Sequence, residues 1–160
     1  MFFYCVAQVC KNGHLINDQA NVHILVNKDF CPKCGAETIT SCPACRATIQ
    51  GAYKTDTTVI PRSNSSLDSF CYNCGKPYPW TQAALLAAAG LIYEEECIPD
   101  DLKDRTVDSL KDIIVETPQT TLAATRIKKC LLSAGNFTAE GIRQFVIDFG
   151  CELAKKTLGL

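Results

Sequence analysis

The sequence has no strong surplus of charge of either sign. It contains 16 Lys and Arg against 17 Asp and Glu, so the net charge at neutral pH is −1. Domains that bind nucleic acid usually carry a basic patch or stripe, and this balance disfavours that class. Thiolates bound to zinc would make the first half of the chain more negative still.

A long apolar run is also missing. The longest one, residues 83–93, is about half the length that spans a bilayer. The chain opens on Met1, Phe2, Phe3 and Tyr4 without a basic region, a sustained apolar stretch or a small-residue cleavage site, so no signal peptide is visible. We therefore expect a cytoplasmic protein with no membrane segment, in a reducing compartment where paired cysteines bind metal.

Recognisable catalytic motifs are scarce. The chain has two histidines and no H-E-x-x-H motif. A thioredoxin-like C-x-x-C pair normally stands alone after a strand of a βαβ unit, whereas the pairs in this chain are several and alike. A zinc- or thiol-dependent enzyme is therefore the third and least favoured interpretation.

Cysteine, in contrast, is abundant, with 11 residues in the chain. Six of them form three C-x-x-C pairs: Cys31/Cys34, Cys42/Cys45 and Cys71/Cys74. This spacing lets both sulfurs of one tight turn reach a single tetrahedral zinc ion. A closed site needs the ligands of two such turns. Three pairs therefore leave one pair incomplete, and its other two ligands must come from earlier in the sequence.

Two zinc ions per chain follow from the spacing. The second site, Cys42, Cys45, Cys71 and Cys74, has the arrangement of a zinc ribbon with a long insert and is the stronger signal. The four ligands of each site would be structural, with no open position for a catalytic water.

The first site combines Cys31 and Cys34 with Cys10 and His14. Asn12-Gly13 is a dipeptide preferred in tight reversals, so the chain should turn there and bring His14 beside Cys10. His14 is the preferred fourth ligand, and the alternatives are Cys5 and His23.

Five aromatic residues surround the second site in the sequence: Tyr53, Phe70, Tyr72, Tyr78 and Trp80. Aromatic rings beside a zinc ribbon can stack on single-stranded bases, but a small zinc module can also bury them as its core. Packing is the favoured interpretation.

The composition predicts an α+β protein, with a two-zinc ribbon-like β module at residues 1–80 followed by a small α-helical bundle at residues 81–160. The expected strands are residues 2–9, 22–26, 38–40, 48–53 and 57–60. The expected helices are residues 82–96 after an N-cap at Thr81, residues 99–115, one opened by Thr117 and Pro118, and a last one from Thr138 to Gly159. The remaining cysteines Cys97, Cys130 and Cys151 are expected to be small buried hydrophobes.

The helix expected at residues 82–96 is apolar nearly all round. Leu85 and Ile92 lie on one face, and Leu86 lies on the other. This second face needs cover, either from the zinc module docked through Trp80 or from the same helix of a second copy. We expect a homodimer through the helical half, and docking on the zinc module explains the same residues.

Three segments of the chain resemble an uncharacterised prokaryotic family known only as a domain of unknown function: residues 6–14, residues 30–39 and residues 70–81. The resemblance covers nearly the whole length. It implies two zinc-binding knuckle pairs joined to a helical tail in a soluble bacterial protein, and it implies no activity. One departure is Arg46, where such knuckles usually place glycine.

The function that we expect from the sequence is that of a zinc-binding interaction or adaptor protein with two structural zinc sites and a protein partner. Nucleic-acid binding through the ribbon is the alternative.

Overall fold

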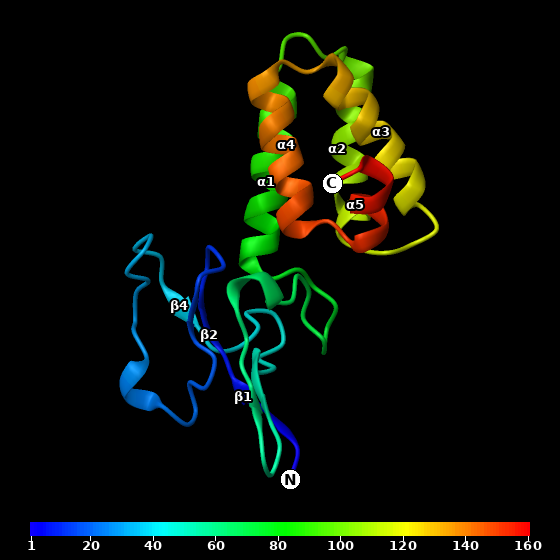
Figure 1. The fold of residues 1–160 in the computed structure, drawn as a ribbon. Helices are drawn as coiled ribbons and strands as arrows, with labels where there is room; N and C mark the ends of the chain where they lie inside the picture. The colour runs from blue at the N-terminus through cyan, green and yellow to red at the C-terminus, as the bar shows by residue number, and fades with distance from the viewer. The chain divides into compact units, whose positions relative to one another are not determined.

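The computed structural model describes all 160 residues and divides them into two compact units, Met1–Gln82 and Ala83–Leu160 (Figure 1). The first unit contains short strands and tight turns, and the second contains helices, so the predicted α+β class is confirmed. The boundary between the units falls inside helix α1, Pro79–Glu94. No helix of the chain is both long and apolar enough to cross a membrane.

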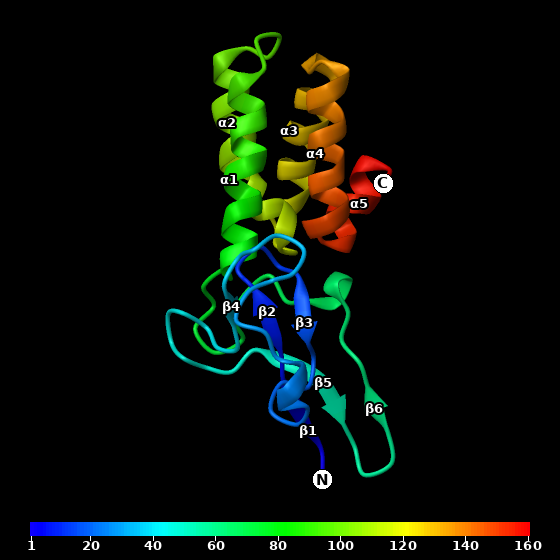
Figure 2. The ribbon, with the colours of Figure 1, turned by 90° about the vertical axis from the view of Figure 1, so that its left-hand side faces the viewer.

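The first unit holds two small antiparallel sheets of three strands each (Figure 2). One sheet has the order β1 (Phe3–Val6), β5 (Gln50–Lys54) and β6 (Val59–Ile60), and the other has the order β3 (Leu15–Asn17), β2 (Gln8–Cys10) and β4 (Thr38–Ile39).

The strand predicted at residues 2–9 is divided between these two sheets. The division falls at Ala7, which is fully buried and donates its amide to the Ile49 carbonyl at 2.8 Å. Gly51 allows the other sheet to approach, because a Cβ there would lie 2.0 Å from the Asp18 carbonyl oxygen. The chain thus passes from one sheet to the next at a fully buried residue.

The prediction of a strand at residues 22–26 is wrong. The segment forms a 3₁₀ turn, η1 (Ile24–Val26), whose side chains are exposed. The cause is the polar side chain of Asn17, which donates to the carbonyl of His23 at 3.0 Å and to the side chain of Asn27 at 2.7 Å. Side-chain bonds of this kind satisfy the backbone locally and compete with strand pairing.

Five helices make up the rest of the chain, where three or four were expected. They are α1 (Pro79–Glu94), α2 (Asp100–Ile114), α3 (Thr120–Ser133), α4 (Asn136–Phe149) and α5 (Glu152–Leu158). Their shared core is aliphatic and fully buried, with Ile92, Ile98, Leu110, Ile113, Ile127, Ile142 and Val146 at its centre.

The predicted start of the first helix is three residues too late. Pro79 begins α1, which proline can do because the first helical residue needs no amide hydrogen. Thr81 therefore lies inside the helix, and its hydroxyl donates to the Ser69 carbonyl at 2.7 Å instead of capping the helix. Pro77 and Pro79 lie where the chain passes from the knuckle of Cys71 and Cys74 into α1.

The other two predicted caps also lie elsewhere. Thr117 and Pro118 form a turn before α3, in which the Thr117 amide donates to the Thr120 hydroxyl at 2.8 Å. Thr138 lies inside α4, whose N-cap is Gly135. The carboxylate of Glu95 accepts the Gly135 amide at 3.1 Å, and nothing in the sequence around Gly135 pointed to this distant cap.

The last predicted helix is in fact two helices. The break falls at Gly150, where the backbone is extended with a ψ of 144°, and the next amide, that of Cys151, donates to the Ile113 carbonyl at 2.9 Å. That bond ties the start of α5 to the end of α2. Gly159, with a φ of 74°, ends α5 as predicted.

The three remaining cysteines differ in their surroundings. Cys130 is completely buried, as expected, whereas Cys97 is exposed and Cys151 is intermediate. The expectation of burial is therefore wrong for Cys97, which lies in the loop between α1 and α2.

Candidate metal centres

The three C-x-x-C pairs adopt one backbone turn three times. In each turn, the amide of the first cysteine donates to the carbonyl five residues ahead, and the amide of the residue after the second cysteine donates back to the first cysteine's carbonyl. The distances are 2.8 and 2.8 Å for the turn at Cys31, 2.8 and 2.9 Å at Cys42, and 2.9 and 2.8 Å at Cys71. The repeated turn places both sulfurs of a pair on one side of the chain.

The residue after the second cysteine has a left-handed backbone in every turn. Gly35 has a φ of 72° and Gly75 a φ of 70°, and Arg46 adopts the same conformation with a φ of 66°. The departure noted in the sequence therefore leaves the turn unchanged. The chain accepts a strained non-glycine residue at this position.

The first cluster joins Cys10 at the end of β2 and His14 after the Asn12-Gly13 turn to the knuckle of Cys31 and Cys34. The Cys10 sulfur lies 3.5 Å from His14 Nδ1 and 3.7 Å from the Cys34 sulfur. The Cys31 sulfur lies 3.6 Å from the same ring nitrogen. One side chain from each turn is buried, since Cys10 and Cys31 are 0% and 3% exposed.

The side chain of Gln8 helps to place the second half of this cluster. Its oxygen accepts the Lys28 amide at 3.0 Å, and its nitrogen donates to the Lys28 carbonyl at 2.9 Å. Gln8 thus binds the loop that leads to Cys31 much as a neighbouring strand would.

The second cluster joins the knuckle of Cys42 and Cys45 to that of Cys71 and Cys74. The sulfurs of Cys42 and Cys74 are 3.8 Å apart, and those of Cys45 and Cys71 are 3.6 Å apart. Cys42 and Cys71 are both 2% exposed, whereas Cys74 is exposed. The two clusters therefore share one pattern of burial.

These separations fit a tetrahedral metal site. Metal–sulfur bonds of about 2.3 Å and metal–nitrogen bonds of about 2.0 Å give tetrahedron edges of about 3.8 Å between sulfurs and about 3.5 Å between sulfur and nitrogen. A disulfide needs sulfurs about 2.05 Å apart, and all eleven cysteines are free. The arrangement is that of two sets of metal ligands.

Hydrogen-bond donors surround the sulfurs. The Asn12 side chain donates to the Cys34 sulfur at 3.4 Å, and the His14 amide donates to the Cys10 sulfur at 3.3 Å. The Ala36 amide and the Asn12 side chain lower the pKa of Cys34 to about 6. Such donors favour the thiolate, which is the form that binds metal.

The second cluster has the same kind of support. Burial alone would raise the pKa of Cys71, but the amides of Cys74 and Asn73 lower it to about 6. The Asn73 amide lies 3.4 Å from the Cys71 sulfur.

Eight residues predicted as ligands thus fall into two groups of four, and the atoms of each group lie within 4.8 Å of one another. Cys5 and His23, the alternatives to His14, lie outside both groups. Cys5 is buried in β1, and His23 is exposed in the loop before η1. That these groups bind a metal, and which metal they bind, stays a prediction.

Trp80 contacts residues beside the second cluster and a residue of the turn in the first cluster. The sequence did not predict the contact with the first cluster. The Trp80 ring stacks on Tyr78 with centroids 4.6 Å apart, and its indole nitrogen donates to the Asp68 carbonyl at 3.1 Å. Its Cβ also lies against Gly13, in the turn between Cys10 and His14. Tyr78 lies near the second cluster, and burial together with the negative charge of Cys71 raises the pKa of its hydroxyl.

Packing therefore uses two of the five aromatic residues around the second site. Tyr78 and Trp80 are 2% and 5% exposed, whereas Tyr72 is 59% exposed. Tyr53 pairs with Tyr4 across β1 and β5 at 4.9 Å.

A model of an uncharacterised protein family conserved in bacteria, DUF2321, matches residues 3–158. The chain belongs to this family. No match to the chain was found among curated proteins, nor among solved structures. The residues that the DUF2321 model covers include both clusters and all five helices.

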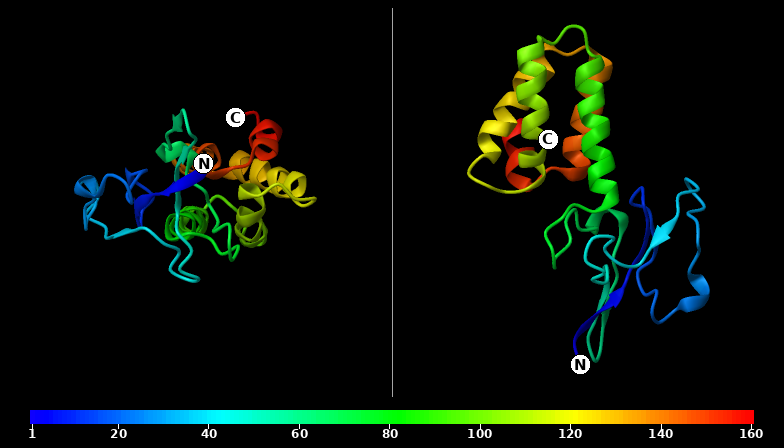
Figure 3. Two further views of the ribbon diagram at one scale, coloured as in Figure 1. Left: turned by 90° about the horizontal axis from the view of Figure 1, so that it is seen from below. Right: turned by 180° about the vertical axis from the view of Figure 1, so that it is seen from behind.

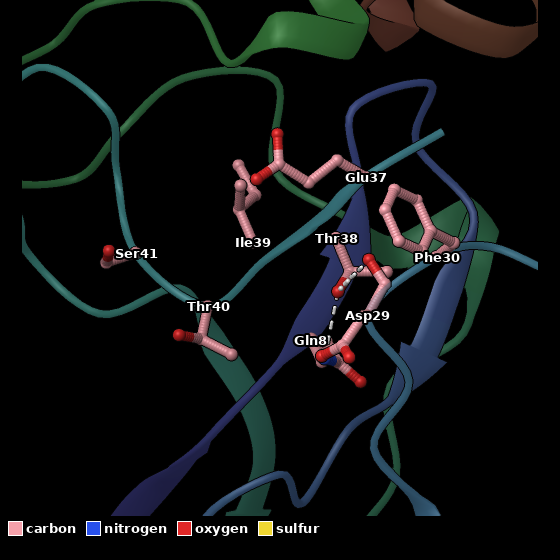
Figure 4. A pocket seen from close by; sticks show the side chains of 8 residues that line it. All are labelled: Gln8, Asp29, Phe30, Glu37, Thr38, Ile39, Thr40 and Ser41. Atoms are coloured by element: carbon pink, nitrogen blue, oxygen red, sulfur yellow. Dashed lines mark hydrogen bonds between the residues drawn. The ribbon is translucent and has the colours of Figure 1, made fainter. Parts of the chain in front are cut away.

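One hollow of the first unit of this DUF2321 chain lies beside β4, with a volume of about 580 Å³. Figure 4 shows the side chains around it, with the Gln8 amide bonded to Thr38. Its lining includes the carboxylates of Asp29 and Glu37 and the hydroxyls of Thr38, Thr40 and Ser41, and no histidine, cysteine or lysine.

Proposed function

We propose that each cluster binds one zinc ion as a structural site. The observation that carries this proposal is that each cluster already provides four donors at tetrahedral spacing. A catalytic zinc keeps one position for water, and neither donor set leaves such a position. The ions would stabilise the first unit, whose short strands offer little core of their own.

We further propose that the chain works as a binding protein whose zinc-stabilised unit presents a surface to a protein partner. Support comes from the loop between β3 and the knuckle at Cys31. Val22, Ile24, Leu25 and Val26 in this loop are 43%, 67%, 101% and 52% exposed. Monomeric soluble proteins rarely expose contiguous apolar patches of this kind without a role in interaction.

Nucleic-acid binding has less support. Two of the aromatic side chains near the second cluster, Tyr78 and Trp80, are buried and cannot stack on bases. The exposed Tyr72 is left as a single stacking platform. Binding to nucleic acid would also fall steeply with salt, which a titration with single-stranded oligonucleotides at two salt concentrations would detect.

The partner surface can be tested in the zinc-bound protein. Cross-linking in the native host, followed by purification, should recover a protein with the wild-type chain and lose it with Ile24→Ser/Leu25→Ser. Phe137→Ser removes an apolar side chain that is 87% exposed in the other unit and serves as the matched control. Equal recovery with the loop variant and the wild type would contradict the proposal.

A further inference from the structure

Helix α2 carries a row of acidic side chains on its exposed surface. Asp101, Asp104, Asp108 and Asp112 are spaced by three or four residues, which places them along one face of the helix. Three of the four are exposed, and Asp112 is half-buried. Like charges four residues apart destabilise a helix, so this face would gain from positive charge facing it.

Helix α3 has the opposite character. It contains no acidic residue, and its exposed face combines Lys128 and Lys129 with two leucines. Leu122 is 47% exposed, and Leu132 is 82% exposed. The face is thus basic with apolar side chains between the charges.

These two faces do not neutralise each other within one chain. Every ion pair of the helical unit joins residues three or four apart in the same helix, such as Asp101 with Arg105. Neither Lys128 nor Lys129 takes part in an ion pair, and Asp104 accepts a hydrogen bond from the Tyr93 hydroxyl at 3.1 Å.

The two helices form an antiparallel hairpin, seen side by side in lime and yellow in Figure 3 (right). Arg126 of α3 donates to the hydroxyl of Ser109 of α2 at 3.0 Å. This bond fixes the height of α3 against α2, that is, its position along the axis of α2. Asp108, just before Ser109, and Lys129, three residues after Arg126, therefore lie within about one helical turn of the same height.

We propose that a second copy of the chain docks on this hairpin, with a two-fold axis running along the helices. Rotation about such an axis does not move any residue along the helix direction, so heights stay the same. It places α2 of each copy against α3 of the other, which gives two equivalent contacts per dimer. The aspartate row then faces the partner's basic face, and Asp108 meets the partner's Lys129. The exposed leucines of α3 supply the apolar contact between the copies.

Charge complementarity selects this face over the one expected from the sequence. Leu86 of α1 is 68% exposed, but the apolar stretch around it, residues 83–92, contains no charged residue that could orient a partner. The proposed α2–α3 interface contains both signs of charge, arranged so that a two-fold axis pairs them.

Charge reversal gives a sharp test on the full, zinc-bound chain. Light scattering of the wild type should rise with concentration from 17.5 kDa towards twice that mass, and added salt should shift it back. Asp108→Lys and Lys129→Glu should each weaken the dimer by about tenfold or more, because each creates two like-charge contacts per dimer. The double variant Asp108→Lys/Lys129→Glu should restore it.

Each alternative outcome overturns the proposal. A mass of 17.5 kDa at all concentrations would exclude the dimer. A dimer that Leu86→Glu breaks and the reversals leave intact would place the interface on α1. Failure of the double variant to recover, with its helical circular dichroism unchanged, would show that the two residues do not face each other. Both are exposed, so the substitutions should leave the fold intact.

Discussion

The Cβ of Trp80 packs so closely on Gly13 that a methyl group added to Gly13 would lie 2.9 Å from it. Gly13 also has a φ of 86°, in the region that disfavours every residue with a side chain. The turn between Cys10 and His14 is thus fixed both by its own backbone and by a residue far away in the sequence.

The first prediction uses this contact. Gly13→Ala should lower the free energy of unfolding by more than the roughly 1–2 kcal/mol of left-handed strain alone, because the new methyl group also displaces Trp80. Gly35→Ala is the matched control, since Gly35 has a φ of 72° and open space around its Cα. Urea denaturation of both zinc-bound variants measures the difference. Equal losses would show that the Trp80 contact adds nothing.

The second prediction concerns Arg46, which is exposed and has a φ of 66°. Arg46→Gly should raise the free energy of unfolding by about 0.5–1 kcal/mol, because glycine adopts this backbone without strain. The reciprocal change Gly75→Arg, at a φ of 70°, should lower it by a similar amount. Thermal melts of the two variants against the wild type provide the measurement, and changes of the same sign would refute the explanation.

Local spacing was sufficient to predict the clusters and the fold class. Two cysteines separated by two residues define a tight turn by themselves, so Cys42, Cys45, Cys71 and Cys74 could be assigned without knowing the rest of the fold. The Asn12-Gly13 turn placed His14 for the same local reason. Helices with an apolar stripe were likewise found near their true positions.

Features that depend on distant partners were out of reach. The cap of α4 is a carboxylate forty residues away, Glu95, and the break before α5 depends on the Ile113 carbonyl. The apolar run at Ile24 has the composition of a strand, but it forms a turn because the Asn17 side chain donates to the His23 carbonyl. Trp80 was recognised as important, whereas its contact with Gly13 needed the folded chain.

The third prediction tests the metal. Elemental analysis of protein purified without added metal should find two zinc ions per chain. His14→Ala should lose one of them, because His14 Nδ1 lies 3.5 Å from the Cys10 sulfur, and His23→Ala should keep both. One zinc ion in the wild type, or equal loss in the two variants, would remove the first site.

The same metal should dominate the stability of the first unit. Structural zinc contributes on the order of 10 kcal/mol to the folding of small modules, so Cys42→Ser should lower the melting temperature strongly. Cys97→Ser is the matched control, since Cys97 is exposed and lies outside both clusters. A chelator should reproduce the effect of Cys42→Ser in the wild type. Unchanged melting on chelation would argue against structural zinc.

The last prediction concerns the pH dependence of the helical unit. The Thr138 hydroxyl and the amides of Cys97 and Gly135 lower the pKa of Glu95 below its usual 4.5. A carboxylate with a lowered pKa in the folded state stabilises that state above its ordinary pKa, and the stabilisation disappears as the pH falls through the lowered value. Glu95→Gln should therefore melt at a lower temperature than the wild type at pH about 7, and the gap should close as the pH falls through the lowered pKa of Glu95.

Its matched control is Glu94→Gln, which removes one negative charge from the neighbouring residue. Glu94 is exposed and makes no hydrogen bond with a helix start, whereas Glu95 accepts the Gly135 amide at 3.1 Å at the start of α4. Far-UV circular dichroism follows the helices in both variants. Because an anion at a helix N-terminus is stabilising through its position, only the Glu95 variant should lose stability at neutral pH. Similar losses in both variants, or a gap that persists in acid, would show that net charge and not the cap of α4 is responsible.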